Sequence, residues 1–342
     1  MTRGAGAGRM ASRDSCSWLN AIHYPTPEQN LLAAVVKSAA RDVRRGCDAD
    51  RATARAYLFG PNFEIDAAVL NDWRPALFIL AALLLALAAP LTARADDPPE
   101  LPPLLFIITG QSNAGQNGRA ATLTAPDVPG AYYYAPQHTR ARAWLPMRPY
   151  GGAFGVELSF ARAVQEATGR TVLVVKLYSG GTSIIAWQPD APNAQWKRDM
   201  ATVGNGTKPA MYPRLRALVA EAQAAWGGLV EFGGVIWVQN ERDSRMGYGA
   251  ARYEANLRAL IAALRADYGE GLPFVAMDTH TRLAYDATVH EAIMRVAEST
   301  PGVQVVPTRD LPVMADSRVH FDSAGLTLLG QRYAAAWEAL EQ

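Results

Sequence analysis

A serine stands where a buried strand is expected to end. The segment 106–118 reads Phe-Ile-Ile-Thr-Gly-Gln-Ser-Asn-Ala-Gly-Gln-Asn-Gly, and Ser112 lies in its glycine-containing turn. A serine placed between a strand and a helix presents an exposed hydroxyl, and nearby backbone N–H groups can receive a developing oxyanion. The same position also suits a helix N-cap serine. The turn alone therefore leaves both interpretations open.

A nucleophilic serine needs a base, because an alcohol is unreactive at its free pKa. The chain has five histidines, His23, His138, His280, His290 and His320. His320 comes just before the expected last helix, and Asp316 precedes it on the same loop. A carboxylate can hold Nδ1 of an imidazole while Nε2 faces a serine. We therefore expect His320 to meet Ser112, with His280, which follows a strand end, as the alternative.

Alternating strands and helices from about residue 101 must position these groups. Apolar runs predict strands at 104–109, 171–178, 232–239, 273–278 and 303–306, and apolar spacing predicts helices at 155–168, 213–226, 253–268, 290–298 and 324–340. Strands that are buried on both faces and joined by helices predict a parallel, doubly wound α/β sheet. Such sheets place their sites beyond the carboxyl ends of the strands.

The composition of the chain argues against some classes of protein. The 342 residues are 49% hydrophobic and 19% charged, with a net charge of +1, which favours neither a disordered chain nor a nucleic-acid binder. Both cysteines, Cys16 and Cys47, precede the α/β region. That region therefore has no disulfide or cysteine-ligated metal, and it shows no other cluster with metal-ligand spacing. We expect no metal and no cofactor.

The apolar run 76–91 divides the chain. Arg74 precedes it, and Thr92-Ala-Arg-Ala follows it. This pattern predicts a signal peptide at 73–95, cleaved after Ala95, and hence a periplasmic or extracellular domain at 96–342. Residues 1–72 are expected to be a helical or disordered extension. Since signal peptides begin near a translation start, we expect the true start near Val69 or Leu70. If residues 1–72 are part of the protein, the run becomes an anchor.

Four short motifs occur in order within residues 103–340. They are Gly110-Gln-Ser-Asn-Ala, Ser179-Gly-Gly-Thr-Ser-Ile, Trp237-Val-Gln-Asn-Glu-Arg-Asp, and Val319-His-Phe-Asp with Gly330-Gln-Arg-Tyr. Together they resemble the SGNH-hydrolase superfamily, in its carbohydrate acetylesterase or sialate O-acetylesterase-like branch. The resemblance implies a three-layer αβα sandwich with a flavodoxin-like parallel sheet of about five strands, which agrees with the α/β pattern above.

The resemblance also implies roles for individual residues. Ser112 would be the nucleophile and His320 the general base and acid. The oxyanion would be held by the N–H of Ser112, by the Gly180–Gly181 turn, and by the side chain of Gln239 or Asn240. Expected substrate contacts are Gln111, Asn113 and Trp187. Loop aromatics, including Tyr132–Tyr134, could stack on sugar rings, with loop packing as the alternative.

The sequence departs from the family pattern at two points. Asn240 stands where the family usually has glycine in its third motif, so which amide points at the oxyanion is open. The family acid usually stands three residues before the histidine, where this chain has Ser317; Asp316 is four before. A one-residue bulge could bring Asp316 to the imidazole. We favour Asp316 as the acid and keep Glu241 as the alternative.

These observations predict a secreted serine esterase that removes O-acetyl groups from carbohydrates of the acetylxylan or sialate type, through an acyl-enzyme. The expected partner is the acetylated carbohydrate, with no nucleic acid and no stable membrane association once the signal is cleaved. Two alternatives remain. One is a lipase-like or aryl-esterase member of the same superfamily, and the other is a non-catalytic carbohydrate-binding envelope protein.

Overall fold

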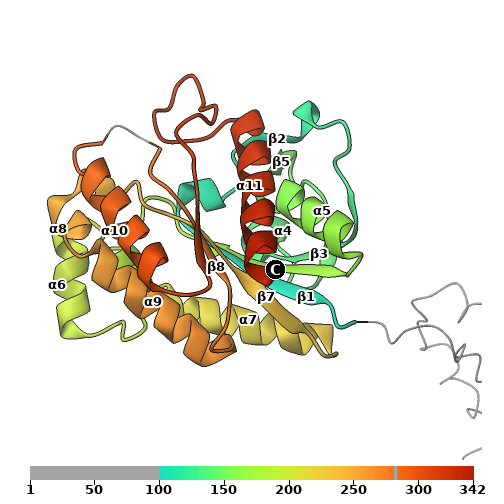
Figure 1. The fold of residues 1–342 in the computed structure, drawn as a ribbon, viewed down its shortest axis with the longest axis horizontal. Coiled ribbons are helices and arrows are strands. Elements are labelled where there is room, and N and C mark those ends of the chain that lie inside the picture. Colours follow the sequence, from blue (N-terminus) through green and yellow to red (C-terminus); the bar gives the residue numbers. More distant parts are fainter. Residues whose placement is uncertain (1–100, 281–282) are drawn as a thin grey trace, which may run out of the picture. The chain divides into compact units, whose positions relative to one another are not determined.

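A seven-stranded sheet, in the order β4-β3-β6-β1-β7-β8-β9, forms the centre of the computed structural model (Figure 1). The strands are β1 Leu104–Gly110, β3 Val128–Tyr134, β4 Leu145–Met147, β6 Val172–Tyr178, β7 Glu231–Val238, β8 Phe274–Met277 and β9 Val303–Val306. Only the β3–β4 pair is antiparallel. The predicted parallel sheet is confirmed, and it is two strands wider than expected. Short strands β2 Gly118–Arg119 and β5 Ala153–Phe154 pair separately.

The structure describes residues 101–280 and 283–342, all within one compact unit, Asp97–Gln342. The extension 1–72, the expected signal peptide at 73–95 and the expected start near Val69 or Leu70 lie outside these residues. Over the described ranges, no helix is both long and apolar enough to cross a membrane.

Strand β3 shows why two strands were missed. Its sequence, Val-Pro-Gly-Ala-Tyr-Tyr-Tyr, contains turn-forming residues, and its pairing with β6 starts only after Gly130, at Ala131. Tyr133 and Tyr134 are buried. The interpretation of Tyr132–Tyr134 as loop aromatics is therefore wrong, because these residues form a strand within the sheet.

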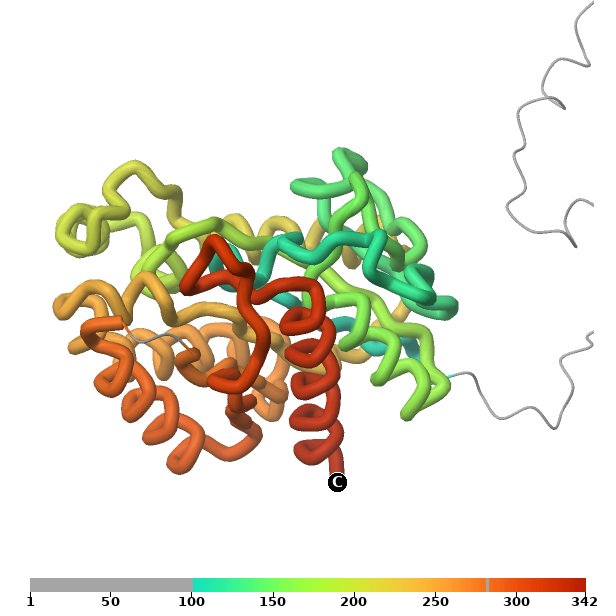
Figure 2. The backbone as a smooth tube through the Cα atoms, turned by 90° about the horizontal axis from the view of Figure 1, so that it is seen from above, coloured from blue at the N-terminus to red at the C-terminus, as the bar shows by residue number. Residues whose placement is uncertain are grey.

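Helices cover both faces of the sheet and complete three layers. The long helices are α5 Glu157–Thr168, α7 Tyr212–Trp226, α9 Tyr253–Tyr268, α10 Asp286–Ser299 and α11 Ser323–Glu341, and the shorter ones are α4 Pro136–Thr139, α6 Ala194–Thr202 and α8 Gly247–Ala250. Along β1, Leu105 and Ile107 pack with α7, α9 and α10, whereas Phe106 and Ile108 pack with α5 and α11. Figure 2 shows α5 and α11 side by side on their face. The predicted αβα sandwich is confirmed.

Candidate active site

The site lies where three neighbouring strands end. Strand β1 is central, and the chain leaves it for β3, returns beside it as β6, and then crosses to β7 on its other side. Gly110 pairs with Tyr178 of β6 and with Val238 of β7, so the loops after these strands begin at the same edge. A Cβ at Gly110 would lie 2.1 Å from the Val238 carbonyl oxygen, so only glycine permits this close approach. This is the switch point at which α/β sheets carry their sites.

A cavity of about 380 Å³ opens at this edge. It is lined by Gln111, Ser112, Gly180, Gly181, Glu241, Arg242, Arg245, Val319 and His320. The first seven come from the loops after β1, β6 and β7, and the last two come from the loop before α11. The sequence motifs thus meet at one cavity, although the two arginines that line it were not singled out from the sequence.

The structure brings Ser112 and His320 together. His320 Nε2 lies 3.0 Å from Ser112 Oγ, across 208 positions of the chain. Ser112 begins a short 3-10 turn, Ser112–Ala114, directly after β1, and the loop from β9 to α11 carries His320 over the sheet edge. The distance is that of a hydrogen bond, so a neutral imidazole with its proton on Nδ1 accepts from the serine hydroxyl.

Ser317, and not Asp316, lies at the other ring nitrogen. Ser317 Oγ is 2.9 Å from His320 Nδ1, and it also accepts from the N–H of His320 (3.1 Å) and of Val319 (3.3 Å). Asp316 is exposed and lines a neighbouring cavity. The expectation that Asp316 holds the imidazole is corrected. The reason is that the turn closes tightly on Ser317 without the bulge that the expectation required.

Glu241 is buried beside the site without contacting the ring. Its side chain accepts from Asn113 Nδ2 and from the N–H of Asn240, and it is 2% exposed. Burial raises the pKa of Glu241, whereas these hydrogen bonds and the nearby His320 oppose the rise. No hydrogen bond joins Glu241 to His320 within the described residues. Neither carboxylate considered from the sequence is therefore a direct partner of the imidazole.

Asn113 fixes the backbone on both sides of the histidine. Its Nδ2 donates to the Val319 carbonyl (2.7 Å), and its Oδ1 accepts from the N–H of Phe321 (3.2 Å). The side chain is completely buried. The expected contact of Asn113 with substrate is therefore corrected, because its polar atoms are taken up inside the protein. It follows Ser112 directly, so it ties the serine turn to the histidine loop.

Backbone N–H groups at the cavity are free to bind an oxyanion. Those of Ser112, Gly180 and Gly181 donate to no protein group within residues 101–280 and 283–342. Gly180 lies next to Ser112, since a Cβ placed on Gly180 would be 3.9 Å from Ser112 Cβ. Three N–H groups from two neighbouring loops are therefore without an acceptor among the described residues, and groups of this kind can receive an oxyanion.

The two amides expected to complete the oxyanion hole point elsewhere. Gln239 Nε2 donates to the Thr182 carbonyl (2.9 Å) and to Asp243 (2.6 Å). Asn240 Nδ2 donates to the Asp278 carbonyl (3.0 Å). Both side chains are completely buried and neither lines the cavity. Their assignment to the oxyanion hole is therefore corrected.

A buried aspartate that sequence reasoning missed explains where Gln239 points. Asp243 accepts from Ser183 Oγ and from the N–H of Ile184 (2.9 Å), in addition to Gln239. Burial raises the pKa of Asp243 to about 6, although these hydrogen bonds oppose the rise. Asp243 thus joins the loops after β6 and β7. Its partners Ser183 and Ile184 are about 60 positions away in the sequence, so the motif that contains Asp243 and Gln239 gave no signal of its role.

The two remaining expected substrate contacts, Gln111 and Trp187, have different outcomes. Gln111 lines the cavity, and its Oε1 accepts from the N–H of Arg242 (3.2 Å) and from Gln239 (3.3 Å), so its Nε2 is left for a ligand. Trp187 is completely buried and packs edge-on against Trp237, with ring centroids 5.4 Å apart. Its expected contact with substrate is corrected, because it belongs to the core.

The sequence is also similar to a known protein family. Residues 102–339, more than half of the chain, match the family model described as carbohydrate esterase, sialic acid-specific acetylesterase. The chain belongs to this family. Membership in this carbohydrate esterase family implies a hydrolase that acts on acetyl esters. A search of curated proteins found no match.

Solved structures share the fold of this esterase. An Arabidopsis thaliana protein is similar with a TM-score of 0.54 and 21% identity, over 70% of this chain and 99% of its own. NanS is similar with a TM-score of 0.50 and 17% identity, over 70% and 98%. A carbohydrate acetylesterase from Xanthomonas citri has a TM-score of 0.49 and 18% identity, over 69% and 56%. At these identities the first two likenesses concern the fold alone, and nothing is argued from the third.

Proposed function

We propose that residues 96–342 form an exported serine esterase that removes O-acetyl groups from carbohydrates, with Ser112 as nucleophile and His320 as general base and acid. The observation that carries this proposal is the 3.0 Å distance between Ser112 Oγ and His320 Nε2 at the lined cavity. The family match adds the acetyl ester and the carbohydrate.

The reaction proceeds in two steps. Ser112 Oγ attacks the acetyl carbonyl while His320 Nε2 takes the hydroxyl proton, and the tetrahedral oxyanion binds the free N–H groups of Ser112, Gly180 and Gly181. The C–O bond to the sugar then breaks, and His320 returns the proton to the sugar oxygen. Water, deprotonated by His320, attacks the acyl-enzyme and releases acetate and free Ser112. Each oxyanion donor is worth about 2.7–4 kcal/mol of the barrier.

The imidazole is oriented by Ser317. With the proton on Nδ1 donated to Ser317 Oγ, Nε2 is the atom that accepts from Ser112. Glu241 acts through Asn113, which holds the histidine loop, rather than through the ring. Replacement variants distinguish these roles. In kcat at pH 7, we expect Ser317→Ala and Glu241→Gln each to cost roughly tenfold or more, and Asp316→Asn to cost nothing. A large loss from Asp316→Asn alone would restore the sequence-based assignment.

The shape of the cavity favours a small acyl group. About 380 Å³ lies near the lower end of ligand-site volumes. This supports acetyl over the long acyl chains of a lipase-like enzyme. Rates on 4-nitrophenyl acetate and octanoate decide between them, and faster turnover of octanoate would favour the lipase-like alternative.

The central test compares the protein with its Ser112→Ala variant. We expect the wild type to hydrolyse 4-nitrophenyl acetate and to release acetate from acetylated xylo-oligosaccharides or O-acetylated sialic acid, and Ser112→Ala to fall to background. Whichever carbohydrate releases acetate identifies the substrate type. Equal background rates for both proteins would overturn the esterase and leave the carbohydrate-binding alternative.

Export is proposed from the apolar run 76–91 with its Ala-x-Ala ending. Peptide mapping of the protein recovered from its native source tests this proposal. We expect the first residue to be Asp96. Peptides from residues 20–60 in the mature protein would overturn both the cleaved signal and the proposed start near Val69 or Leu70.

A further inference from the structure

Lysine is rare in this chain, and two lysines bind the turns beside the nucleophile. The sequence has four, Lys37, Lys176, Lys197 and Lys208. Lys176 Nζ donates to the Gly115 carbonyl, and Lys208 Nζ donates to the Gly180 carbonyl, both at 2.9 Å. Lys197, on α6, is exposed. Two of the three described lysines thus hold glycine carbonyls in the two loops that supply the free N–H groups of the cavity.

Lys176 is an unusual residue for its position. It lies on β6, completely buried, and pairs with Glu157 Oε2 at 2.6 Å. Glu157 begins α5, where the helix terminus favours a carboxylate, and its Oε1 accepts from the N–H of Gly155 (2.9 Å). A buried ion pair gains little stability over well-packed apolar residues, because both charges must be desolvated. An apolar pair would, however, leave the Gly115 carbonyl without its donor.

The Gly115 carbonyl belongs to the turn that presents the nucleophile. The N–H of Gly115 donates to the Ser112 carbonyl at 2.8 Å and closes the turn. Lys176 holds the other end of Gly115, from the strand beneath. The surroundings are tightly packed, since a Cβ at Gly155 would lie 2.2 Å from the Gly115 carbonyl oxygen. Rotation of the turn, which would redirect the N–H of Ser112, therefore requires breaking the bond to Lys176.

Lys208 acts on the second loop from the opposite side. It lies between α6 and α7 and is partly exposed. In a trans peptide the carbonyl and the following N–H point in opposite directions. Holding the Gly180 carbonyl toward Lys208 therefore fixes the direction of the free N–H of Gly181. Asn205 Nδ2 donates to the Gly181 carbonyl (3.1 Å) and secures the next peptide group.

We propose that Lys176, paired with Glu157, and Lys208 are positioning residues for the oxyanion hole. Each fixes a glycine carbonyl and thereby holds an N–H group, of Ser112 or of Gly181, in the direction that receives the oxyanion. The inference rests on the proposed esterase function and adds two residues that do not touch the reacting atoms. Because the oxyanion develops only in the transition state, these lysines affect kcat more than KM.

A matched set of lysine-to-methionine variants tests the inference. We expect Lys208→Met to lower kcat roughly tenfold or more with KM within about twofold, Lys208→Arg to restore most of kcat, and Lys197→Met to match the wild type. Lys176→Met leaves Glu157 unpaired, so the double variant Lys176→Met/Glu157→Gln is used to remove the charge. We expect the double variant to recover thermal stability while its kcat stays roughly tenfold or more below wild type. Phosphonylation of Ser112 by a 4-nitrophenyl phosphonate should slow in parallel.

Several outcomes would overturn the inference. If Lys208→Met and the double variant keep wild-type kcat, the lysines do not position the oxyanion hole, while the esterase assignment stands. A higher KM with unchanged kcat would make them substrate-binding residues. If the double variant does not fold, Lys208→Met and Lys208→Arg decide alone. A wild type without Ser112-dependent hydrolysis would remove the proposed function and this inference with it.

Discussion

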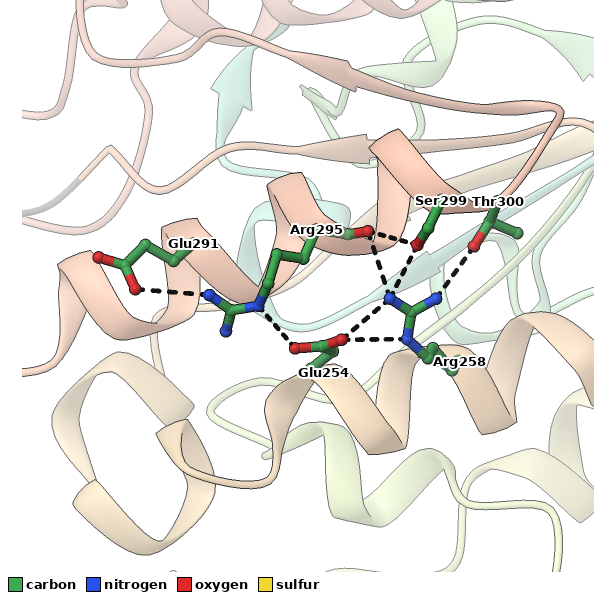
Figure 3. Close-up of polar contacts among 6 residues, drawn as sticks. All are labelled: Glu254, Arg258, Glu291, Arg295, Ser299 and Thr300. Atoms are coloured by element: carbon green, nitrogen blue, oxygen red, sulfur yellow. Dashed lines mark hydrogen bonds and ion pairs between the residues drawn. The ribbon is translucent and has the colours of Figure 1, made fainter.

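Two clusters of charged residues join helices to their neighbours in this esterase, and they differ in burial. Beneath the Ser112 turn, Lys176 and Glu157 have side chains 0% and 2% exposed. Between α9 and α10, Arg295 and Glu254 have side chains 51% and 33% exposed (Figure 3). Water competes for the charged groups of the exposed cluster, whereas burial shields the Lys176–Glu157 pair from water. The comparison teaches that an ion pair defines a position only where water cannot replace either partner.

The exposed cluster has a different task. Glu254 on α9 accepts from Arg258 (2.9 Å) and from Arg295 of α10 (2.8 Å). Arg258 also donates to the Arg295 carbonyl and to Ser299 Oγ, near the end of α10 (Figure 3). Ser299 Oγ donates to the same Arg295 carbonyl (2.6 Å), so Arg258 and Ser299 meet at one point of α10. This cluster joins α9 to α10 at the protein surface and takes no part in the candidate site.

The largest effect is expected from breaking the buried pair. Lys176→Met leaves the Glu157 carboxylate buried without its partner, which costs about 3–5 kcal/mol of the free energy of unfolding. Urea denaturation at pH 7 measures this loss. The double variant with Glu157→Gln should recover most of it, because no unpaired charge remains. A single variant as stable as the wild type would show that the buried pair and the exposed cluster behave alike.

An intermediate effect concerns His138, which lies near Lys176. Its ring stacks on Tyr178, and burial, helped by the charge of Lys176, lowers the pKa of His138 to about 3. The unfolded chain takes up this proton near pH 6.5 and the folded protein does not, so stability falls as the pH falls from 6.5 toward 3. From pH 7 to 4.5 this residue costs about 2 kcal/mol, with allowance for its partial exposure.

The variant His138→Phe keeps the stacked ring and removes the titration. We expect its unfolding free energy to drop less than that of the wild type between pH 7 and pH 4.5, measured by urea denaturation at both values. Asp243, whose pKa is raised to about 6, acts in the opposite direction but is present in both proteins and cancels. Identical pH dependence in the two proteins would show that His138 is protonated as readily when folded as when unfolded.

The smallest effect is expected at the exposed cluster. Arg295→Met removes the contacts to Glu254 and Glu291, which solvent already screens. We expect a slightly lower urea midpoint at low salt, no difference from wild type at 1 M NaCl, and unchanged esterase kcat. A loss as large as that of Lys176→Met would contradict the distinction drawn between the two regions.

Much of the fold follows from local sequence. The strands β1, β6, β7 and β8 are mainly apolar runs, as burial on both faces of a sheet requires, and β9 is a short, mostly apolar edge strand. The helices between the strands show one apolar side. Strand β3 was not predicted because Pro129 and Gly130 resemble a turn, and pairing with β6 on one side and β4 on the other stabilises it as a strand. Pairing with a partner distant in sequence overrides local propensity.

The sequence predicted the two groups expected to react, Ser112 and His320, but not the residues that hold them in place. Ser112 and His320 were expected to meet, since each stands at a carboxyl edge or beside it, and they lie within hydrogen-bond distance. The acid and the amides were misplaced. The local turn decides whether Asp316 or Ser317 faces the ring, and the hydrogen bonds between Ser317 Oγ and His320 set that turn.

The sequence by itself determined which candidate groups are available, because residue identity and order place a serine and two glycines just after strand ends and a histidine just before the last helix. Only the tertiary structure decided which polar groups remain free. Gln239 and Asn240 carry suitable amides, yet Asp243 and the end of β8 take up their hydrogens, whereas the N–H of Gly181 is left unpaired. Hydrogen-bond satisfaction depends on every neighbour in space at once, and those neighbours come from segments that no local pattern relates.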